Sequence, residues 1–271
     1  MEEIVVALDG SDFANRALPI AKALAAAADA RLRVIGIAPS DAELAWTYDK
    51  VHEAVDRAGL HGIDVNVRVD PHPVEILLAT GATEGTVLCL ATHDRPDPMA
   101  KALRAVGSLV LQRSERPVLA VGPCASAEAQ GSDVVVAIDG VTDPEPLLSV
   151  ATDWATRLGS GLRIVTVYEP VPPDLDQPGH YTRQHGPAGD PDDYVKSVRE
   201  RVAELSFAVD AVAIADPVGV AAGLEQHLAD APARVLVLGG RHPRLLKPSG
   251  ATAEHLLRNL TLPVLLVNHP D

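Results

Sequence analysis

The chain has 271 residues, a length that predicts two domains, each large enough to have its own core. Only 3% of the residues are aromatic, so the cores are expected to consist mainly of Ala, Val, Leu and Ile. The net charge of −14 at pH 7 argues against a nucleic-acid or anionic-membrane partner, because both would repel the protein.

Covalent and targeting features point to the cytoplasm. The two cysteines, Cys89 and Cys124, are too few for a disulfide framework or a metal-binding motif. No apolar run approaches the roughly 20 residues of a membrane span, and the first residues lack the basic and apolar stretches of a signal peptide. We therefore expect a cytoplasmic protein.

A short apolar run ends in Asp-Gly near the start of the chain and again in its second half. Residues 4–8 precede Asp9, and residues 134–138 precede Asp139, 130 positions later. Such a run is typical of a buried strand that ends in a sharp turn. Without polar alternation, it belongs in a parallel sheet covered on both faces. The recurrence predicts the same unit twice.

Beyond this strand, the first repeat alternates between helical and strand-like spacing of apolar residues. Helices are predicted over residues 14–28, 44–55, from 73 onwards and over 103–111, and strands over residues 32–38, 65–69, 86–91 and 117–122. The second of these helices is expected to face the core with Leu44, Tyr48, Val51 and Val55.

The second repeat follows the same order and is longer. Its further strands are predicted over residues 162–167, 207–214, 235–239 and 263–267. An insertion at about 169–192, rich in Pro, Gly and Asp, is expected to lack regular structure. Residues 123–132 are small and polar and would link a domain at 1–122 to one at 133–271.

This alternation predicts an α/β fold made of two tandem, doubly wound, five-stranded parallel sheets of the Rossmann-like type. Ligands of such sheets bind beyond the carboxyl ends of the strands, where the strand order reverses. In each repeat this edge would hold the turn after the first strand and the loop after the fourth.

Four motifs together resemble the universal stress protein family: Val-Val-Ala-Leu-Asp-Gly-Ser at 5–11, Asp-Pro at 70–71, a Thr-His…Arg loop from Thr92, and Pro-Val-Leu-x-Val at 117–121. The resemblance covers nearly the whole chain as a tandem pair and implies a regulatory protein of the stress response. Family members are ATP-binding or non-binding. The binders share Gly-x2-Gly-x9-Gly-Ser/Thr after the fourth strand, where glycines let the backbone approach the triphosphate.

In the first repeat these motif positions fall on Ala91, Asp94, Arg104 and Ala105, and none is glycine. Asp94 would bring negative charge close to the phosphates. A magnesium ion could use such carboxylates, but the simpler interpretation is a loop that has lost its phosphate contacts. Asp9, the first-strand acid that lies near the nucleoside in binders, is a weak candidate contact.

In the second repeat, Gly239 and Gly250 hold the first and last glycine positions, although the loop is two residues short and His242 replaces the middle glycine. Arg241 adds positive charge, which suits phosphate. The resemblance therefore implies ATP, with magnesium, or another adenine nucleotide in this repeat. The predicted contacts are Asp139, Gly140, Gly239, Gly240, Arg241, Gly250, Ala251 and Thr252.

Structural interpretations compete with this site. The two first-strand acids can instead hold their own turns by accepting backbone amides, and the loop cations can simply balance nearby acids. The main alternative function is therefore a nucleotide-free protein–protein interaction module of the same fold. No catalytic or metal-binding motif is present, and we expect no enzyme.

The last strands, residues 118–121 and 264–267, would lie at sheet edges, which associate unless they are paired or covered. Domains of the family pair through this strand, so the resemblance implies that the two domains of this chain pair internally. Association of such a chain into a homodimer is a further expectation. The alternative is that helices or loops cover both edges.

Overall fold

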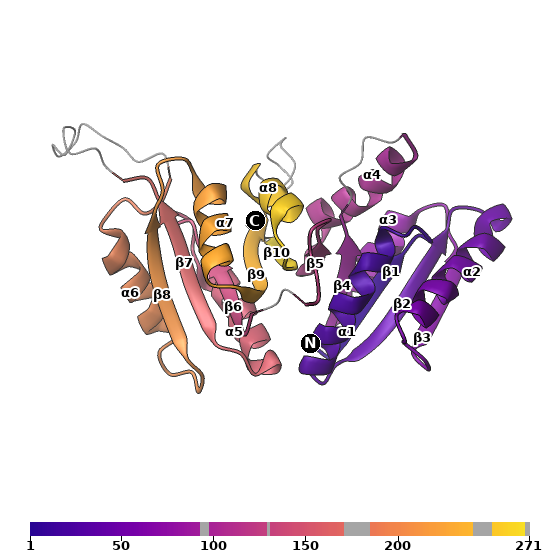
Figure 1. The fold of residues 1–271 in the computed structure, drawn as a ribbon, viewed down its shortest axis with the longest axis horizontal. Coiled ribbons are helices and arrows are strands. Elements are labelled where there is room, and N and C mark those ends of the chain that lie inside the picture. The colour runs from indigo at the N-terminus through magenta and orange to yellow at the C-terminus, as the bar shows by residue number, and fades with distance from the viewer. Residues whose placement is uncertain (93–97, 129–130, 171–184, 241–250, 269–271) are drawn as a thin grey trace. The chain divides into compact units, whose positions relative to one another are not determined.

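The computed structural model describes residues 1–92, 98–128, 131–170, 185–240 and 251–268, with the backbone alone at 98–105 and 251. The chain forms two compact units (Figure 1). The first unit contains residues 1–129 and 240–271, and the second unit contains residues 130–239.

The first unit has a sheet in the order β3-β2-β1-β4-β5-β10. Its strands are β1 (Glu3–Leu8), β2 (Arg31–Ala38), β3 (Asp64–Val69), β4 (Thr86–Ala91), β5 (Val118–Val121) and β10 (Val264–Asn268). Its helices are the 3-10 helix η1 (Ala14–Arg16), α1 (Ala17–Ala27), α2 (Asp41–Arg57), α3 (Pro73–Ala82), α4 (Pro98–Arg113) and α8 (Ala251–Asn259). The strands β1 to β5 run parallel, and their order reverses between β1 and β4.

The second unit has parallel strands in the order β9-β6-β7-β8. The strands are β6 (Asp133–Ala137), β7 (Leu162–Tyr168), β8 (Val209–Ala215) and β9 (Ala233–Gly240). The helices are α5 (Glu145–Leu158), α6 (Pro191–Arg201) and α7 (Val220–Asp230). The order reverses between β6 and β9, so each repeat has its reversal beside its own first strand.

These observations confirm the predicted α/β fold with a mostly parallel sheet. Within the first unit, β10 adds to the edge of the sheet by antiparallel pairing with β5, with Leu265 opposite Leu119. The Asn268 side-chain amide supports this pairing by donating to the Leu111 and Ser114 carbonyl oxygens at 2.9 and 2.7 Å. Because of this pairing, the compact units are not divided at the predicted domain limits. Those limits, and pairing of whole domains through their last strands, stay predictions.

The core consists mainly of aliphatic side chains, as the composition predicted, with Trp154 on α5 buried among them. The prediction that Tyr48 faces the core was wrong. Tyr48 on α2 is 50% exposed and its ring stacks on His52. The buried stripe of α2 begins at Thr47 and continues through Val51, a spacing that turns Tyr48 toward solvent.

None of the helices in the described ranges combines the length and the apolar composition that crossing a lipid bilayer requires.

The two thiols should differ sharply in reactivity. Burial in β4 raises the pKa of the Cys89 thiol to about 12, so at pH 8 this group stays protonated, whereas Cys124 is exposed. We expect Ellman's reagent to modify one thiol promptly in the native protein and the second only after unfolding in urea. Cys124→Ser should remove the prompt reaction. Two thiols that react equally fast in the native state would contradict the buried position of Cys89.

Candidate functional site

Each repeat places an aspartate directly after its first strand, at the carboxyl edge of the sheet. Asp9 follows β1 and Asp139 follows β6 by one further residue. In both turns a glycine comes next with a positive φ, +82° at Gly10 and +73° at Gly140, a conformation that side chains disfavour. The two acids therefore occupy equivalent positions beside the reversal of strand order, where α/β sheets bind ligands.

Asp139 uses both carboxylate oxygens within its own turn. Oδ1 accepts hydrogen bonds from the Val141 and Thr142 amides at 2.9 and 2.8 Å, and Oδ2 accepts one from the Thr142 hydroxyl at 2.6 Å. Burial, the largest single influence, would raise the pKa of Asp139. The hydrogen bonds from Thr142 and Val141 together outweigh burial, and the pKa is lowered. This carboxylate therefore serves as the anchor of its turn.

The chain itself covers the Asp139 turn. Residues 185–190, called here the returning segment, form the last part of the insertion before α6. The His185 carbonyl of this segment accepts a hydrogen bond from the Glu169 amide at 3.2 Å. Pro187 of this segment is buried against Gly140, where an added Cβ would lie 2.6 Å from the proline nitrogen. Burial and the neighbouring Asp139 carboxylate raise the pKa of Tyr194. Pro187 thus covers the Gly140 side of this turn, while Asp139 and Val141 remain exposed.

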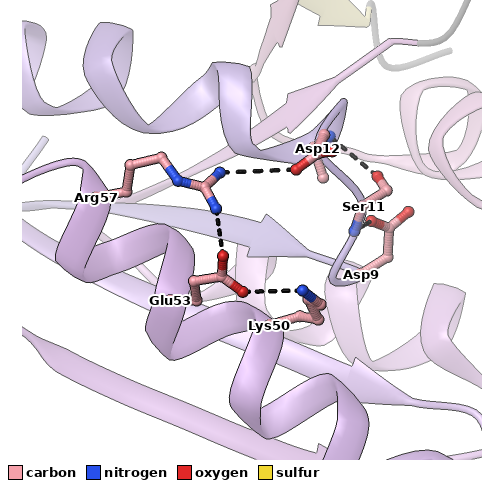
Figure 2. A network of polar contacts seen from close by, with 7 residues as sticks. Asp9, Ser11, Asp12, Lys50, Glu53 and Arg57 are labelled. Carbon is pink, nitrogen blue, oxygen red and sulfur yellow. Dashed lines mark hydrogen bonds and ion pairs between the residues drawn. The ribbon is translucent and has the colours of Figure 1, made fainter.

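Asp9 is used differently. Its Oδ1 accepts a hydrogen bond from the Ser11 amide at 2.8 Å, and the Ser11 hydroxyl oxygen accepts one from the Ala14 amide at 3.1 Å. The position that corresponds to Thr142 is Asp12, whose side chain is 96% exposed and lies 3.7 Å from Arg57. Figure 2 shows the other Asp9 oxygen pointing away from this network. None of the described residues donates a hydrogen bond to that oxygen.

Helix α2 holds the Asp9 turn from the other side. The Trp46 ring covers Gly10 so closely that an added Cβ would lie 2.8 Å from it. On the same helix, Glu53 joins Lys50 at 2.9 Å and Arg57 at 2.6 Å, and Arg57 reaches the turn (Figure 2). These exposed ion pairs add little stability, so the contact of Trp46 with Gly10 is the firmer constraint.

A cavity of about 100 Å³ lies beside Asp9 in the first unit. It is lined by the ends of β1, β2 and β4 together with η1, α3 and α4, at the point where the strand order reverses. Representative lining residues are Leu8, Asp9, Ile37, Leu77, Ala91 and Gly107. A second cavity, of about 340 Å³, lies between α6 and the amino end of β8, and its lining includes two cations and an acid.

The other predicted site residues are placed as follows. Gly239 and Gly240 end β9, with Gly239 exposed, while Ala251 begins α8 in the first unit and Thr252 follows it. Arg241 and Gly250 lie outside the described residues, so the phosphate loop of the second repeat stays a prediction. In the portion that the structure describes, no cluster of three or more His, Cys, Asp or Glu side chains forms a metal site.

Sequence reasoning missed two features of this edge, the cavity beside Asp9 and the second-oxygen bond of Asp139. The signal for the second was available, because Thr142 and Asp12 stand at matching positions after the two acids. The threonine hydroxyl can donate a hydrogen bond to the second oxygen of the preceding aspartate, whereas the carboxylate of Asp12 has no hydrogen to donate. The cavity had no comparable signal, since its walls come from six separate elements.

Replacing Asp139 by Asn should destabilise the protein by about 1 kcal/mol at pH 7, because the charged acceptor of three hydrogen bonds is lost. Since the folded pKa of Asp139 lies below the ordinary 3.8, the wild-type advantage is present above that pH and is lost as the pH falls through the folded pKa. Urea titrations at several pH values measure the difference. Thr142→Val, which removes the hydroxyl donor and keeps the Asp139 carboxylate, is the matched control. A stability advantage of the wild type that grows as the pH falls would contradict the role of Asp139 as the anchor of its turn.

Comparisons with known proteins agree with the fold. The model of the universal stress protein family matches residues 132–268, just over half of the chain. A universal stress protein from Archaeoglobus fulgidus DSM 4304 is 16% identical with a TM-score of 0.66, covering 99% of this chain and 98% of its own. A putative universal stress protein from Pseudomonas aeruginosa UCBPP-PA14 is 17% identical with a TM-score of 0.62, covering 99% and 93%.

A functionally unknown protein from Pseudomonas aeruginosa PAO1 is 19% identical with a TM-score of 0.61, covering 99% of this chain and 92% of its own. At these identities the three structures show a shared fold. No curated protein sequence gives a match. The family match spans the second repeat from its first strand to its last, with the first-strand acid, Asp139, within it. The resemblance expected from the sequence is therefore confirmed, and the chain belongs to the universal stress protein family.

Proposed function

We propose that this universal stress protein is a regulatory protein of the stress response that binds an adenine nucleoside or nucleotide, and that it is a binding protein and not an enzyme. The observation that supports the proposal best is the cavity beside Asp9, at the reversal of strand order in the first unit. A mostly apolar hollow with a polar group on its wall has the chemical character of a small-molecule site, although this one is smaller than most.

The two repeats differ in how much of the first-strand acid is used by its own turn. Asp9 lines the cavity and has one oxygen beyond its turn, which can accept an N–H or O–H group. Asp139 has both oxygens bonded to Val141 and Thr142. Pro187 also packs over Gly140, where a ligand would otherwise approach. These contacts favour the first unit as the binding site.

The second repeat carries a second candidate. Its Gly239, Arg241 and Gly250 keep more of the family's phosphate motif than the first repeat does, which favours ATP with magnesium there. The described residues include only Gly239 of these three. The nucleotide-free interaction module is the remaining alternative, and it becomes the preferred function if neither repeat binds a nucleotide.

Isothermal titration with adenosine and with ATP and magnesium tests the proposal through two matched variants. Asp9→Asn and Asp139→Asn each keep one side-chain acceptor for their turn and remove the charge. We expect Asp9→Asn to weaken binding by about tenfold to a hundredfold, the value of a hydrogen bond to a charged group. Asp139→Asn should leave the affinity of the first-unit site unchanged.

The opposite result would assign the binding site to the second repeat. Binding that is lost in Asp139→Asn or Gly250→Asp, and retained in Asp9→Asn, would contradict the first-unit assignment and favour the second repeat. No heat with either ligand at high protein concentration would reject nucleotide binding altogether. Steady release of a hydrolysis product on prolonged incubation would reject the statement that the protein is not an enzyme.

A further inference from the structure

We infer that the cavity of the first unit admits the edge of one uncharged ring and disfavours phosphate, so that this site prefers an unphosphorylated ligand such as adenosine to AMP or ATP. The inference rests on the proposed function, because it concerns the ligand class of the same cavity. Three properties of the cavity support it: its size, its charge and the glycine in its wall.

The cavity is small. Its volume of about 100 Å³ is well below the roughly 300–1,000 Å³ of typical ligand pockets. An apolar protein cavity of about 150 Å³ accepts a benzene molecule. The space beside Asp9 therefore suits part of a single planar ring, and any sugar or phosphate attached to that ring must remain outside.

The wall has the wrong charge for phosphate. Its side chains are aliphatic, as at Leu8, Ile37 and Leu77, and Asp9 is the one ionisable residue among those that line the cavity in the described part of the chain. A carboxylate oxygen accepts a hydrogen bond from a ring N–H or amino group and repels a phosphate oxygen. A ligand with the ring and without the phosphates satisfies Asp9 at lower electrostatic cost.

Gly107 keeps the cavity open. It lies inside α4 and lines the cavity, and an added Cβ there would meet no atom of the described residues within 4 Å. Glycine is unfavourable inside a helix, since it gains backbone freedom on unfolding. Neither the backbone conformation nor crowding by the described residues requires a glycine at this position. A larger side chain would both favour the helix and fill the space that the ring needs.

Titration with adenine, adenosine, AMP and ATP with magnesium tests the preference. We expect adenine and adenosine to bind with similar affinity and ATP about tenfold or more weakly, because the Asp9 carboxylate repels the negative charge of the phosphates even when they remain outside the cavity. Asp9→Asn should weaken adenosine binding and reduce the difference in affinity between adenosine and ATP. A merely structural role of Asp9 would lower all affinities equally and leave that difference unchanged.

Gly107→Leu tests the cavity directly. It should abolish adenosine binding while the thermal midpoint stays the same or rises, which separates a filled cavity from a misfolded chain. Ala91→Leu fills the same space from β4, so a loss of binding in both variants cannot come from a change in α4 alone. Gly189→Leu is the matched control, since its added Cβ also meets no atom within 4 Å but lies in the second unit.

The outcomes separate the two proposals. If ATP binds more tightly than adenosine and Asp9→Asn weakens both, the first-unit site stands and the preference for an unphosphorylated ligand is overturned. If Gly107→Leu binds adenosine as well as the wild type does, the cavity is not the site and this inference is overturned. If none of the four ligands binds the wild-type protein, the proposed function fails, and the inference fails with it.

Discussion

A carboxylate at the end of the first strand holds the turn that leads out of the sheet in each repeat. The backbone amides of that turn point to one side-chain oxygen, from Ser11 to Asp9 and from Val141 and Thr142 to Asp139. The following glycine takes a conformation that other residues disfavour. Because the turn lies at the carboxyl edge, beside the reversal of strand order, its hydrogen bonds decide what this edge can offer to a ligand.

The same acid leads to opposite outcomes in the two repeats because of residues outside the shared motif. Thr142 donates its hydroxyl to the second oxygen of Asp139, whereas the equivalent Asp12 turns outward to Arg57. Pro187, from an insertion that the first repeat lacks, packs on Gly140. The duplicated motif therefore ends in a turn that bonds both oxygens of its acid in the second unit, and beside a cavity in the first. A ligand that donates a hydrogen bond needs an acceptor with capacity that the fold does not already use.

Other paired contacts keep the symmetry of the repeat. Arg33 bonds to Glu3 at 3.0 Å, and Arg163, 130 positions later, bonds to Asp133 at 2.7 Å, so each pair ties the first two strands together near their amino ends. These side chains are largely covered, which lets a charged hydrogen bond contribute more than it would at an open surface. The repeats thus remain alike where the contacts are structural and differ at the carboxyl edge, where function is expected.

The sequence by itself determined the duplication, the order of strands and helices, the α/β class and the family, because these depend on local periodicity and on short motifs. Tertiary structure alone decided the burial of each helix face, since Tyr48 fits an apolar spacing yet lies outside the buried stripe of α2. It alone decided that the cavity lies beside Asp9, and that both oxygens of Asp139 are bonded within its own turn. The physical reason is that a carboxylate's free oxygen and a cavity's volume depend on which distant segments pack around them.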